Sequence, residues 1–525
     1  MTAICVPIFL RDPGAALVEA ATAAEAGADL VELRADEADA AAIGAAVRGS
    51  PLPTIVTIRA AYEGGRCTLD DAARAPLFAA AAEAGAAYLD CELAAFERTP
   101  ALRDTLLRCC RQPEHGTGPH LIISSHDFAG RPADLPALLA RLAAVRPASI
   151  AKLAFLAGSL RDAADALALM PDFRRRHGME LLALAMGPFG QITRLLAPKY
   201  GAPLTFATVA AGGESAPGQP TVRELVELYR FREQKPSWPV YGVVGWPVGH
   251  SLSPHVHNAG FAHLGHAGVY VPLPIAPTHD EFCSNVDALR ACPGLDLRGL
   301  SVTIPHKEHA LTYARAHGAV IDELSARIGA VNTLAWQPDG TLVATNSDYA
   351  GALDALTDAL GTGRAGLAGR SAAVLGAGGG ARAIVAGLAA SGARVTIYNR
   401  TVAKAAELAA GFAESGVQAA PLDAVSAGAS DIYINCTSLG MHPKVEGCPV
   451  PEAMHFTPQA VVFDTVYTPR DTLLLRRAAA DGARTIPGLE MFVRQAAVQF
   501  ELFTGRSAPV DTFRRVMTGA LAARG

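Results

Sequence analysis

One lysine and one histidine in the first part of the chain have the chemistry for a Schiff-base reaction. Lys152 is the only lysine among the first 198 residues and lies in an apolar, strand-like run. A lysine amine condenses with a ketone, and the resulting imine is an electron sink that lets a neighbouring C–H lose its proton. The apolar neighbours Leu153 and Phe155 favour the uncharged amine. His126 follows another apolar run and can take up and return a proton near neutrality. The alternative for Lys152 is a lysine extending along a barrel rim.

A second lysine, with a carboxylate, indicates proton transfer to an oxygen. Lys307 follows Thr303-Ile304-Pro305, and Asp348 follows the strand-like segment 341–345. A lysine near a ketone can protonate the alkoxide that hydride addition leaves, and a carboxylate can hold that lysine in place. We therefore predict a proton-transfer dyad at the junction of the two halves of a doubly wound fold, where such folds bind ligands. A structural salt bridge is the alternative.

A glycine-rich loop joins a short apolar strand, 372–375, to a helix, 382–390; it consists of Gly376, Ala377, Gly378, Gly379, Gly380 and Ala381. Glycines allow a tight turn and close approach of a pyrophosphate to the N–H groups at a helix start. A second strand, 394–398, ends in Asn399, Arg400 and Thr401, where the ribose of a dinucleotide is bound. Arg400 offers a cation to a 2′-phosphate, so the pattern favours NADP over NAD, with a solvated surface arginine as the alternative.

The elements that position these residues alternate between strand and helix. Eight strand-like runs separated by Ala- and Leu-rich helical stretches predict a (β/α)₈ barrel in the first 230 residues. The runs are Ala3–Phe9, Asp29–Leu33, Thr54–Ile58, Tyr88–Leu93, His120–Ser125, Ser149–Leu153, Glu180–Ala185 and Leu204–Ala207. Polar residues follow the strand ends, where barrel enzymes have their active sites; they are Glu32, Arg34, Arg59, Asp90, Glu92, His126 and Lys152. Strand ends are also polar because they approach solvent, which is the alternative for each residue alone.

Composition narrows the function classes. The 525 residues carry a net charge of −5, which argues against a nucleic-acid binder with a basic patch. Half of the residues are hydrophobic, yet no segment predicts a membrane helix, and the first ten residues lack a basic region typical of a signal or transit peptide. Nine cysteines without a CxxC pair favour a reduced cytoplasmic protein. His255 and His257 fall on different faces of a predicted helix, so we predict no metal site.

These motifs resemble two enzymes of the shikimate pathway fused in one chain. Residues 1–230 are similar to type I 3-dehydroquinate dehydratase through 31–34, 57–59, 63–65, 124–128, 151–153, 190–194 and 215–219. Residues 239–525 are similar to shikimate dehydrogenase through 249–254, 301–307, 329–333, 346–348, 376–381, 399–401, 435–438, 464–469 and 488–499. Small departures stand at Ser347, at Gly187 after Met186, and at Thr193. They concern fine substrate contacts, since the hydroxyl at 347 and the carboxylate of Asp348 are kept.

The resemblance implies a role for each site residue of the first module. It dehydrates 3-dehydroquinate to 3-dehydroshikimate through a Schiff base on Lys152, with His126 as the acid–base group and Glu63 orienting it. Arg194 would clamp the substrate carboxylate through two hydrogen bonds. The hydroxyls and the carboxylate would also be held by a wider set, namely Glu32, Arg34, Arg59, Ser215 and Gln219.

In the second module the resemblance implies reduction of 3-dehydroshikimate to shikimate with NADPH. Lys307 and Asp348 would be the catalytic dyad. Ser251 and Ser253 would bind the carboxylate near a helix start, with a plain helix cap as the alternative. The remaining substrate contacts would be Thr303, Asn332, Tyr467 and Gln495; the cofactor site would add Lys404, Thr437 and Met491 to the glycine loop and to 399–401.

The expected fold class is α/β, a TIM barrel followed by a two-lobed dehydrogenase with a Rossmann-type NADP domain. The expected divisions are a barrel (1–230), a charged, Pro-containing linker (231–238), a shikimate-binding domain (239–351), an NADP-binding domain (352–487) and C-terminal helices returning to the substrate domain (488–525), beginning with an amphipathic helix over Gly488–Thr504. A catabolic quinate/shikimate dehydrogenase fusion and an inactive regulator of the same fold are the alternatives. Lys152, His126, Lys307 and Asp348 are all present, which favours an enzyme. Its expected partners are small-molecule substrates, with the oligomeric state open.

Overall fold

The structure is a computed structural model of the 525-residue chain, and it describes residues 1–110, 118–146, 148–210, 212 and 218–522. The chain divides into two compact units. One contains Met1–Val240 with Ala267–Ala276 and Cys283–Leu297, and the other contains Tyr241–His266, Pro277–Phe282 and Arg298–Gly525.

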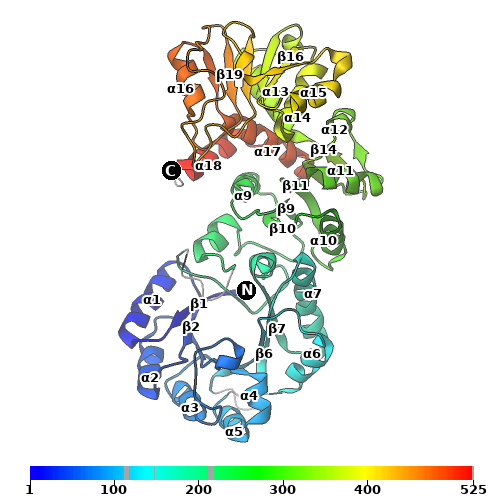
Figure 1. The fold of residues 1–525 in the computed structure, drawn as a ribbon. Coiled ribbons are helices and arrows are strands. Elements are labelled where there is room, and N and C mark those ends of the chain that lie inside the picture. The colour runs from blue at the N-terminus through cyan, green and yellow to red at the C-terminus, as the bar shows by residue number, and fades with distance from the viewer. Residues whose placement is uncertain (111–117, 147, 211, 213–217, 523–525) are drawn as a thin grey trace. The chain divides into compact units, whose positions relative to one another are not determined.

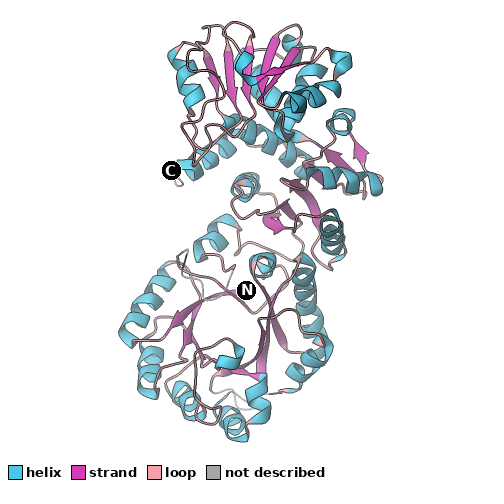
Figure 2. Cartoon of the chain, in the orientation of Figure 1, coloured by secondary structure: helices cyan, strands magenta, loops and turns pink. Residues whose placement is uncertain are grey.

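The first unit is built on an eight-stranded sheet in the order β7-β6-β5-β4-β3-β2-β1-β8, in which neighbouring strands are parallel. The sheet curves into a nearly closed ring with helices on its outside (Figures 1 and 2), so the predicted barrel is confirmed. The strands are β1 (Ala3–Phe9), β2 (Leu30–Arg34), β3 (Thr54–Thr57), β4 (Tyr88–Glu92), β5 (His120–Asp127), β6 (Ala148–Leu156), β7 (Glu180–Met186) and β8 (Leu204–Phe206). The helices are α1 (Pro13–Glu25), α2 (Ala40–Gly49), α3 (Ala75–Glu83), α4 (Leu93–Arg98), α5 (Pro100–Cys109), α6 (Leu135–Ala144), α7 (Leu160–His177) and α8 (Ile192–Leu195).

Local sequence explains where several barrel helices begin. Asp12, Asp39 and Asp134 precede α1, α2 and α6, and each side chain accepts a hydrogen bond from a backbone N–H of the first turn. Such caps satisfy N–H groups that have no partner within the helix. Inside the barrel, alternate strand residues such as Leu30, Ile122 and Leu182 form an apolar cluster. This cluster fills the interior, so that polar side chains gather at the carboxyl ends of the strands.

The second unit contains most of a six-stranded mixed sheet in the order β10-β9-β11-β13-β14-β12. Its strands are β9 (Val240–Gly245), β10 (Val269–Pro274), β11 (Leu297–Val302), β12 (Val320–Ile321), β13 (Thr333–Trp336) and β14 (Leu342–Thr345). The accompanying helices are α9 (Ser253–Leu264), α10 (His279–Ala291), α11 (Lys307–Ala316), α12 (Glu323–Ile328) and α13 (Ser347–Leu360). Two of these helices, α11 and α13, begin beside the predicted dyad residues.

A second six-stranded sheet is parallel throughout and has the order β17-β16-β15-β18-β19-β20. Its strands are β15 (Ser371–Leu375), β16 (Arg394–Asn399), β17 (Gln418–Pro421), β18 (Ile432–Asn435), β19 (Val461–Asp464) and β20 (Arg484–Ile486), and its helices are α14 (Gly379–Ala390), α15 (Val402–Ala410) and α16 (Leu473–Ala480). The order reverses between β15 and β18, which is the dinucleotide-binding arrangement and confirms the predicted Rossmann-type domain.

Two C-terminal helices, α17 (Gly488–Thr504) and α18 (Val510–Ala522), complete the second unit. The predicted amphipathic helix has the bounds of α17, whose buried residues include Leu489, Val493 and Phe500. It packs against α13, while α18 packs against α9. These contacts bring the end of the chain to the mixed sheet's helices.

The segment 231–238, predicted as a linker, is anchored to the barrel within the first unit. Phe231 and Trp238 are buried, the Gln234 side chain donates to Leu195 O (3.0 Å), and Lys199 Nζ donates to Pro236 O (2.8 Å). The predicted domain limits remain predictions.

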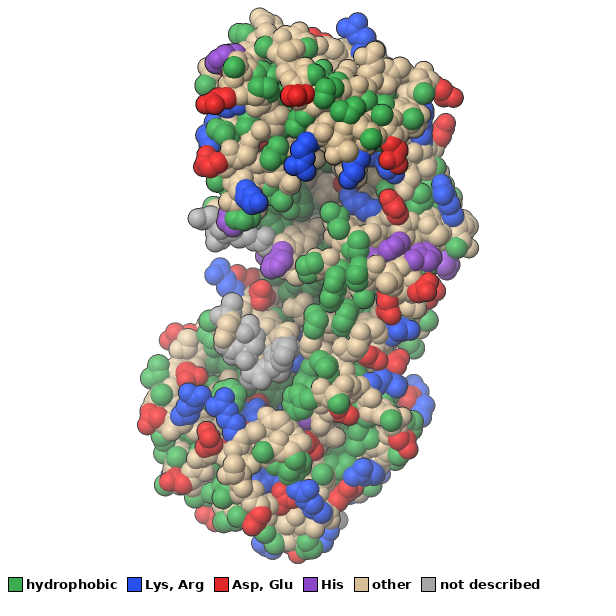
Figure 3. Space-filling view, in the orientation of Figure 1, with side chains coloured by type: hydrophobic (Ala, Val, Ile, Leu, Met, Phe, Trp, Pro, Cys, Tyr) green, Lys and Arg blue, Asp and Glu red, His purple; other side chains and the backbone are tan. Residues whose placement is uncertain are grey.

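None of the helices in the described part of the chain is both long and apolar enough to cross a membrane. On the face drawn in Figure 3, acidic and basic side chains are interspersed.

Candidate active sites

The barrel contains a cavity of about 120 Å³ at the carboxyl ends of its strands. All of the described residues predicted for the first module line it: Glu32, Arg34, Arg59, Glu63, His126, Lys152, Arg194 and Gln219. Ser215, also predicted, lies outside the described residues. The remaining lining includes the apolar side chains of Phe128, Met186 and Phe206. Charged groups therefore converge on a small space with an apolar side, from β2, β5, β6, α8 and the segment that follows β3.

Lys152 enters this cavity from β6 between two carboxylates. Its Nζ lies 2.8 Å from Asp90 Oδ2 and 3.5 Å from Glu32 Oε1, and it stands over the Phe206 ring at 4.6 Å from the centroid. The side chain is almost fully buried. The sequence-based expectation of an apolar setting is therefore wrong for the amine itself. Side chains of a strand alternate between its two faces, so the residues next to Lys152 in β6 point away from the cavity. The amine instead contacts the inward-facing Glu32 of β2 and Asp90 of β4.

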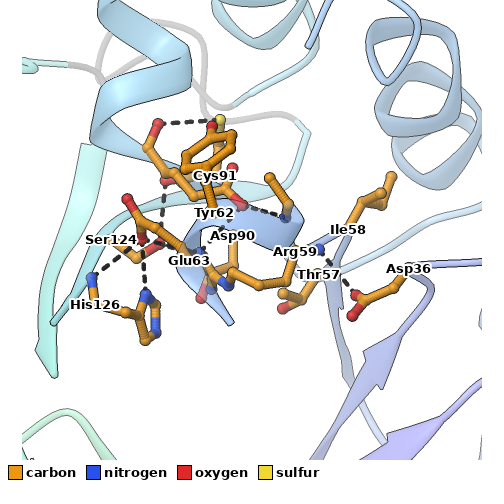
Figure 4. A network of polar contacts seen from close by, with 12 residues as sticks. Asp36, Thr57, Ile58, Arg59, Tyr62, Glu63, Asp90, Cys91, Ser124 and His126 are labelled. Atoms are coloured by element: carbon orange, nitrogen blue, oxygen red, sulfur yellow. Dashed lines mark hydrogen bonds and ion pairs between the residues drawn. The ribbon is translucent and has the colours of Figure 1, made fainter. Parts of the chain in front are cut away.

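His126 is held by Glu63. Glu63 Oε2 accepts from the backbone N–H of His126 and lies 3.0 Å from His126 Nδ1 (Figure 4). Burial raises the pKa of Glu63 to about 7, although the Arg59 cation opposes this. Burial, together with the Arg59 and Lys152 cations, lowers the pKa of His126 well below its ordinary value. An uncharged imidazole with Nδ1 facing the carboxylate leaves its other nitrogen for proton transfer.

Asp90 connects the lysine to Arg59 and was named from the sequence only as a strand-end residue. Its Oδ1 lies 2.7 Å from Arg59 Nη2 and accepts from Ser124 Oγ, also at 2.7 Å (Figure 4). Burial alone raises the pKa of Asp90, but Arg59 and Lys152 outweigh it and hold that pKa well below the ordinary range. Asp90 thus remains a carboxylate beside the amine. The sequence could have indicated a role for Asp90 through its position, because it lies two residues before the end of β4, where alternate side chains point into the barrel.

Arg194 provides a buried cation that no carboxylate contacts among the described residues. The side chain is 2% exposed, its Nη1 donates to Ala185 O at 2.8 Å, and burial lowers its pKa to about 10. Of the residues that the structure describes, none places a carboxylate against it. An uncompensated buried guanidinium is costly, so the site is suited to an anion that enters the cavity.

The second unit contains a larger cavity, of about 510 Å³, between the ends of the two sheets and α17. The lining includes every residue predicted for substrate and proton transfer in the second module, namely Ser251, Ser253, Thr303, Lys307, Asn332, Asp348, Tyr467 and Gln495. It also includes Gly380 and Met491, two residues predicted for the cofactor, and Gln499, to which the sequence analysis assigned no role.

Lys307 and Asp348 form the expected contact, with Nζ 2.5 Å from Oδ2. Asn332 Nδ2 donates to the other carboxylate oxygen of Asp348 (3.0 Å) and to Gln495 Oε1 (3.4 Å). Asp348 is the second residue of α13, and its N–H donates to Oδ1 of the cap residue Asn346. Gln499 joins Ser301 to Thr333 next to Asn332. The carboxylate is thus fixed on both oxygens, while the lysine is partly exposed to the cavity.

The two serines predicted to bind a carboxylate stand at the start of α9. Leu252 is the cap residue of this helix and makes no side-chain cap bond. Ser253 N–H donates to Ser251 Oγ at 3.2 Å. Neither serine therefore occupies the cap position itself. Both hydroxyls line the cavity instead.

The glycine loop has the geometry that a dinucleotide requires. Gly376 has φ of 111°, a conformation that favours glycine, and a Cβ there would lie 3.1 Å from the backbone of Cys436. Helix α14 begins at Gly379, directly after Gly378, and a Cβ on either of them or on Gly380 would meet no atom within 4 Å. The first N–H groups of α14 therefore face a space that a pyrophosphate can enter.

The predicted ribose-binding residues follow β16. Asn399 Nδ2 donates to Thr401 O at 2.8 Å, and Arg400 and Lys404 are exposed. Within the described part of the chain Arg400 makes no ion pair. Thr437 lies across the strand-order reversal, where its hydroxyl donates to Asn435 Oδ1 at 2.7 Å. The residues present thus fit a dinucleotide whose adenosine half carries negative charge.

Comparison with known proteins gives a match to each module. A model of the type I 3-dehydroquinase family matches residues 4–236. Residues 243–334 match the shikimate dehydrogenase substrate binding domain, residues 360–472 match the shikimate/quinate 5-dehydrogenase family, and residues 488–518 match the shikimate 5′-dehydrogenase C-terminal domain.

Whole proteins are similar as well. The chloroplastic bifunctional 3-dehydroquinate dehydratase/shikimate dehydrogenase of Arabidopsis thaliana is 37% identical over 533 residues, covering 98% of this chain and 84% of the relative. The NADP⁺ shikimate dehydrogenase of Methanocella arvoryzae is 44% identical over 285 residues, 54% of this chain and 99% of the relative. The solved dehydroquinate dehydratase and shikimate dehydrogenase from S. pombe covers 98% of both chains at 24% identity and a TM-score of 0.43.

Proposed function

Because the chain belongs to the bifunctional 3-dehydroquinate dehydratase/shikimate dehydrogenase family, we propose that its two cavities catalyse consecutive reactions of the shikimate pathway. The barrel dehydrates 3-dehydroquinate to 3-dehydroshikimate. The second unit reduces 3-dehydroshikimate to shikimate with NADPH. The observation that carries this proposal is the convergence of separately predicted residues on one cavity in each unit. A role in aromatic amino acid biosynthesis is part of the proposal, and the cytoplasmic location stays a prediction.

In the barrel, Lys152 is the nucleophile. Its amine adds to the substrate ketone and water leaves, which gives an imine on Nζ. His126 removes the proton beside the imine carbon, and the same group protonates the departing hydroxyl, which leaves as water. Hydrolysis of the imine then restores the amine, so that the net change is loss of one water. Asp90, at 2.8 Å from Nζ, supports the charge of the protonated imine.

Substrate orientation in the barrel is assigned to the buried cations. Arg194 has no carboxylate against it among the described residues and is proposed to bind the carboxylate of the substrate. Arg59 is fixed by Asp90 and Ser124 at 2.7 Å each. With Glu32, Arg34 and Gln219, it supplies hydrogen bonds around the hydroxyls. Ser215 remains a proposed contact that lies outside the described residues.

The proposed role of Glu63 predicts an acid limb in the pH profile of the dehydratase. As a carboxylate, Glu63 accepts the Nδ1 proton and leaves the other nitrogen of His126 as the base. Below the raised pKa of about 7, Glu63 is protonated and donates to Nδ1 instead, which puts the imidazole in the wrong tautomer. Activity should therefore fall as pH decreases through about 7. A profile of kcat/KM against pH measures this limb, because kcat/KM reports the ionisation of groups in the free enzyme.

Glu63→Gln serves as the control for this profile, since it cannot titrate. It should show a low kcat without the limb. An acid limb that persists in Glu63→Gln would contradict the role of Glu63.

In the second unit, Lys307 and Asp348 are proposed as the dyad that supplies a proton to the substrate oxygen. NADPH, when bound, supplies the hydride. Ser251 and Ser253 bind the carboxylate, and Thr303, Asn332, Tyr467 and Gln495 bind the ring hydroxyls. The loop from Gly376 to Ala381, residues 399–401, Lys404, Thr437 and Met491 hold the dinucleotide, which is supported by the glycine conformation and the exposed cations.

Arg400→Ala should raise the KM for NADPH much more than the KM for NADH. A charged hydrogen bond to the 2′-phosphate contributes about 1.5–3 kcal/mol, which is roughly tenfold or more in affinity. NADH has no such phosphate to lose. Steady-state kinetics with both cofactors measures the difference. Arg394→Ala is the matched control, because Arg394 is exposed at the opposite end of the same strand. Equal effects on the two cofactors would exclude phosphate binding by Arg400.

A further inference from the structure

Two buried, oppositely charged side chains lie behind the wall of the dehydratase cavity without lining it. Arg74 precedes α3, Glu92 ends β4, and both are 0% exposed. Arg74 Nη1 lies 2.8 Å from Glu92 Oε2. A buried ion pair contributes little net stability compared with well-packed apolar side chains, because both charges lose their hydration. Stability therefore does not by itself account for this pair.

The pair contacts the backbone on both sides of Arg59. Arg74 Nη1 donates to Ile58 O at 2.7 Å, and the N–H of Ala60 donates to Glu92 Oε1 at 2.8 Å. The same segment continues into the short helix η1 (Ala61–Glu63), which ends on Glu63. Two residues of the cavity, Arg59 and Glu63, are thus carried by one turn that the ion pair holds from behind (Figure 4 shows this turn).

Further contacts tie the turn to the same network. Arg74 Nη2 donates to Asp71 Oδ1 at 2.6 Å, and Asp71 also accepts from Tyr62 Oη in η1 at 3.3 Å. The side chain of Glu92 also acts directly on two cavity residues. Its Oε1 is 3.6 Å from Arg59 Nη1, and its charge raises the pKa of Glu63. The pair therefore acts on both the position and the charge of the groups in the cavity.

We infer that Arg74 and Glu92 are positioning residues for the dehydratase reaction, which hold the backbone around Arg59 so that Arg59 and Glu63 reach the substrate and His126. The inference rests on the proposed roles of Arg59 and Glu63. Neither member of the pair touches a reacting atom. Their effect passes through the turn from Ile58 to Glu63.

The test is the double variant Arg74→Met/Glu92→Met in the full chain. It replaces the pair with apolar side chains and leaves no orphaned charge in that pair, so the barrel should fold. The expected result is a fall in dehydratase kcat of about 10–100-fold with a raised KM, because Arg59 and Glu63 lose their backbone supports. Dehydrogenase activity of the same molecules should stay unchanged and reports that the chain is intact.

The pH profile gives a second readout. The charged groups that face Glu63 are Arg59 from its own turn, Asp90 and Glu92 from β4, and His126 from β5. Since the Glu92 charge raises the pKa of Glu63, its removal should move the acid limb to lower pH. Arg74→Lys keeps the cation without the planar fork and should recover part of kcat. Arg141→Met is the matched control, because Arg141 forms its ion pair with Glu97, an exposed carboxylate outside this network, and the substitution should leave kcat unchanged.

Active sites are counted in each variant by borohydride trapping of substrate on Lys152. A double variant with reduced turnover per trapped site, and with its acid limb moved to lower pH, supports the inference that Arg74 and Glu92 position the active-site turn. Turnover that falls only in proportion to the trapped sites, or a native kcat and limb in the double variant, overturns it. No adduct on Lys152 in the unaltered chain would overturn the proposed Schiff base, and the inference with it, whereas a normal adduct with native variant kinetics overturns the positioning pair alone.

Discussion

Lys152→Ala should abolish dehydratase activity and leave dehydrogenase activity near that of the unaltered chain. The Lys152 amine is the group in the barrel cavity that is proposed to bond covalently with substrate. Without it no imine forms, and the substrate lacks the electron sink that makes loss of the proton feasible. The dehydrogenase groups lie in a different cavity lined by the second unit. Assays of the two reactions on the same preparation measure the separation. The loss in the first reaction should be complete.

Trapping identifies the bonded atom directly. Borohydride added with 3-dehydroquinate should reduce the imine to a stable adduct on Lys152, and mass spectrometry of peptides locates it. Lys235→Ala is a matched control, since Lys235 is an exposed lysine of the same unit and should trap normally. An adduct on any other lysine would exclude the Schiff-base assignment, as would an active Lys152→Ala protein.

Lys307→Ala should lower the dehydrogenase kcat by about 10²–10⁴-fold with little change in the KM for shikimate. Hydride addition leaves an alkoxide that needs a proton, and Lys307 is the cation at 2.5 Å from Asp348 in the cavity. Asp348→Asn should cause a similar loss, because a neutral amide no longer supplies the negative charge that holds the Lys307 ammonium in place. Steady-state kinetics in both reaction directions separates kcat from KM.

Two measurements distinguish this dyad from a structural salt bridge. The thermal unfolding midpoint should change little in Lys307→Ala, since the lysine side chain is 29% exposed and Asp348 keeps its hydrogen bond from Asn332. Dehydratase activity in the same chain reports on overall integrity. If activity were lost only in step with stability, or if the main effect were a raised KM, Lys307 would be a structural or binding residue.

Local pattern accounts for much of what was predictable. The first strand was predicted over Ala3–Phe9, and β1 has these limits. Such limits are predictable because the apolar runs that form barrel strands are short and bounded by polar residues. The rim residues were predictable for the same reason, since parallel strands bring their carboxyl ends to one face. The glycine loop follows from conformation, as Gly376 shows with φ of 111°. Each of these properties depends on neighbours in the chain.

The amino-acid sequence by itself thus determined the α/β fold class with its two folds, the chemistry available and the end of the barrel at which the charged residues lie. The tertiary structure alone decided which side chains meet. It placed Asp90 rather than apolar groups against Lys152, left Arg194 without a carboxylate partner among the described residues, and set Arg74 and Glu92 behind Arg59. Such contacts join residues from different strands and turns. They depend on strand register and on closure of the barrel, which long-range packing fixes and a local sequence pattern does not encode.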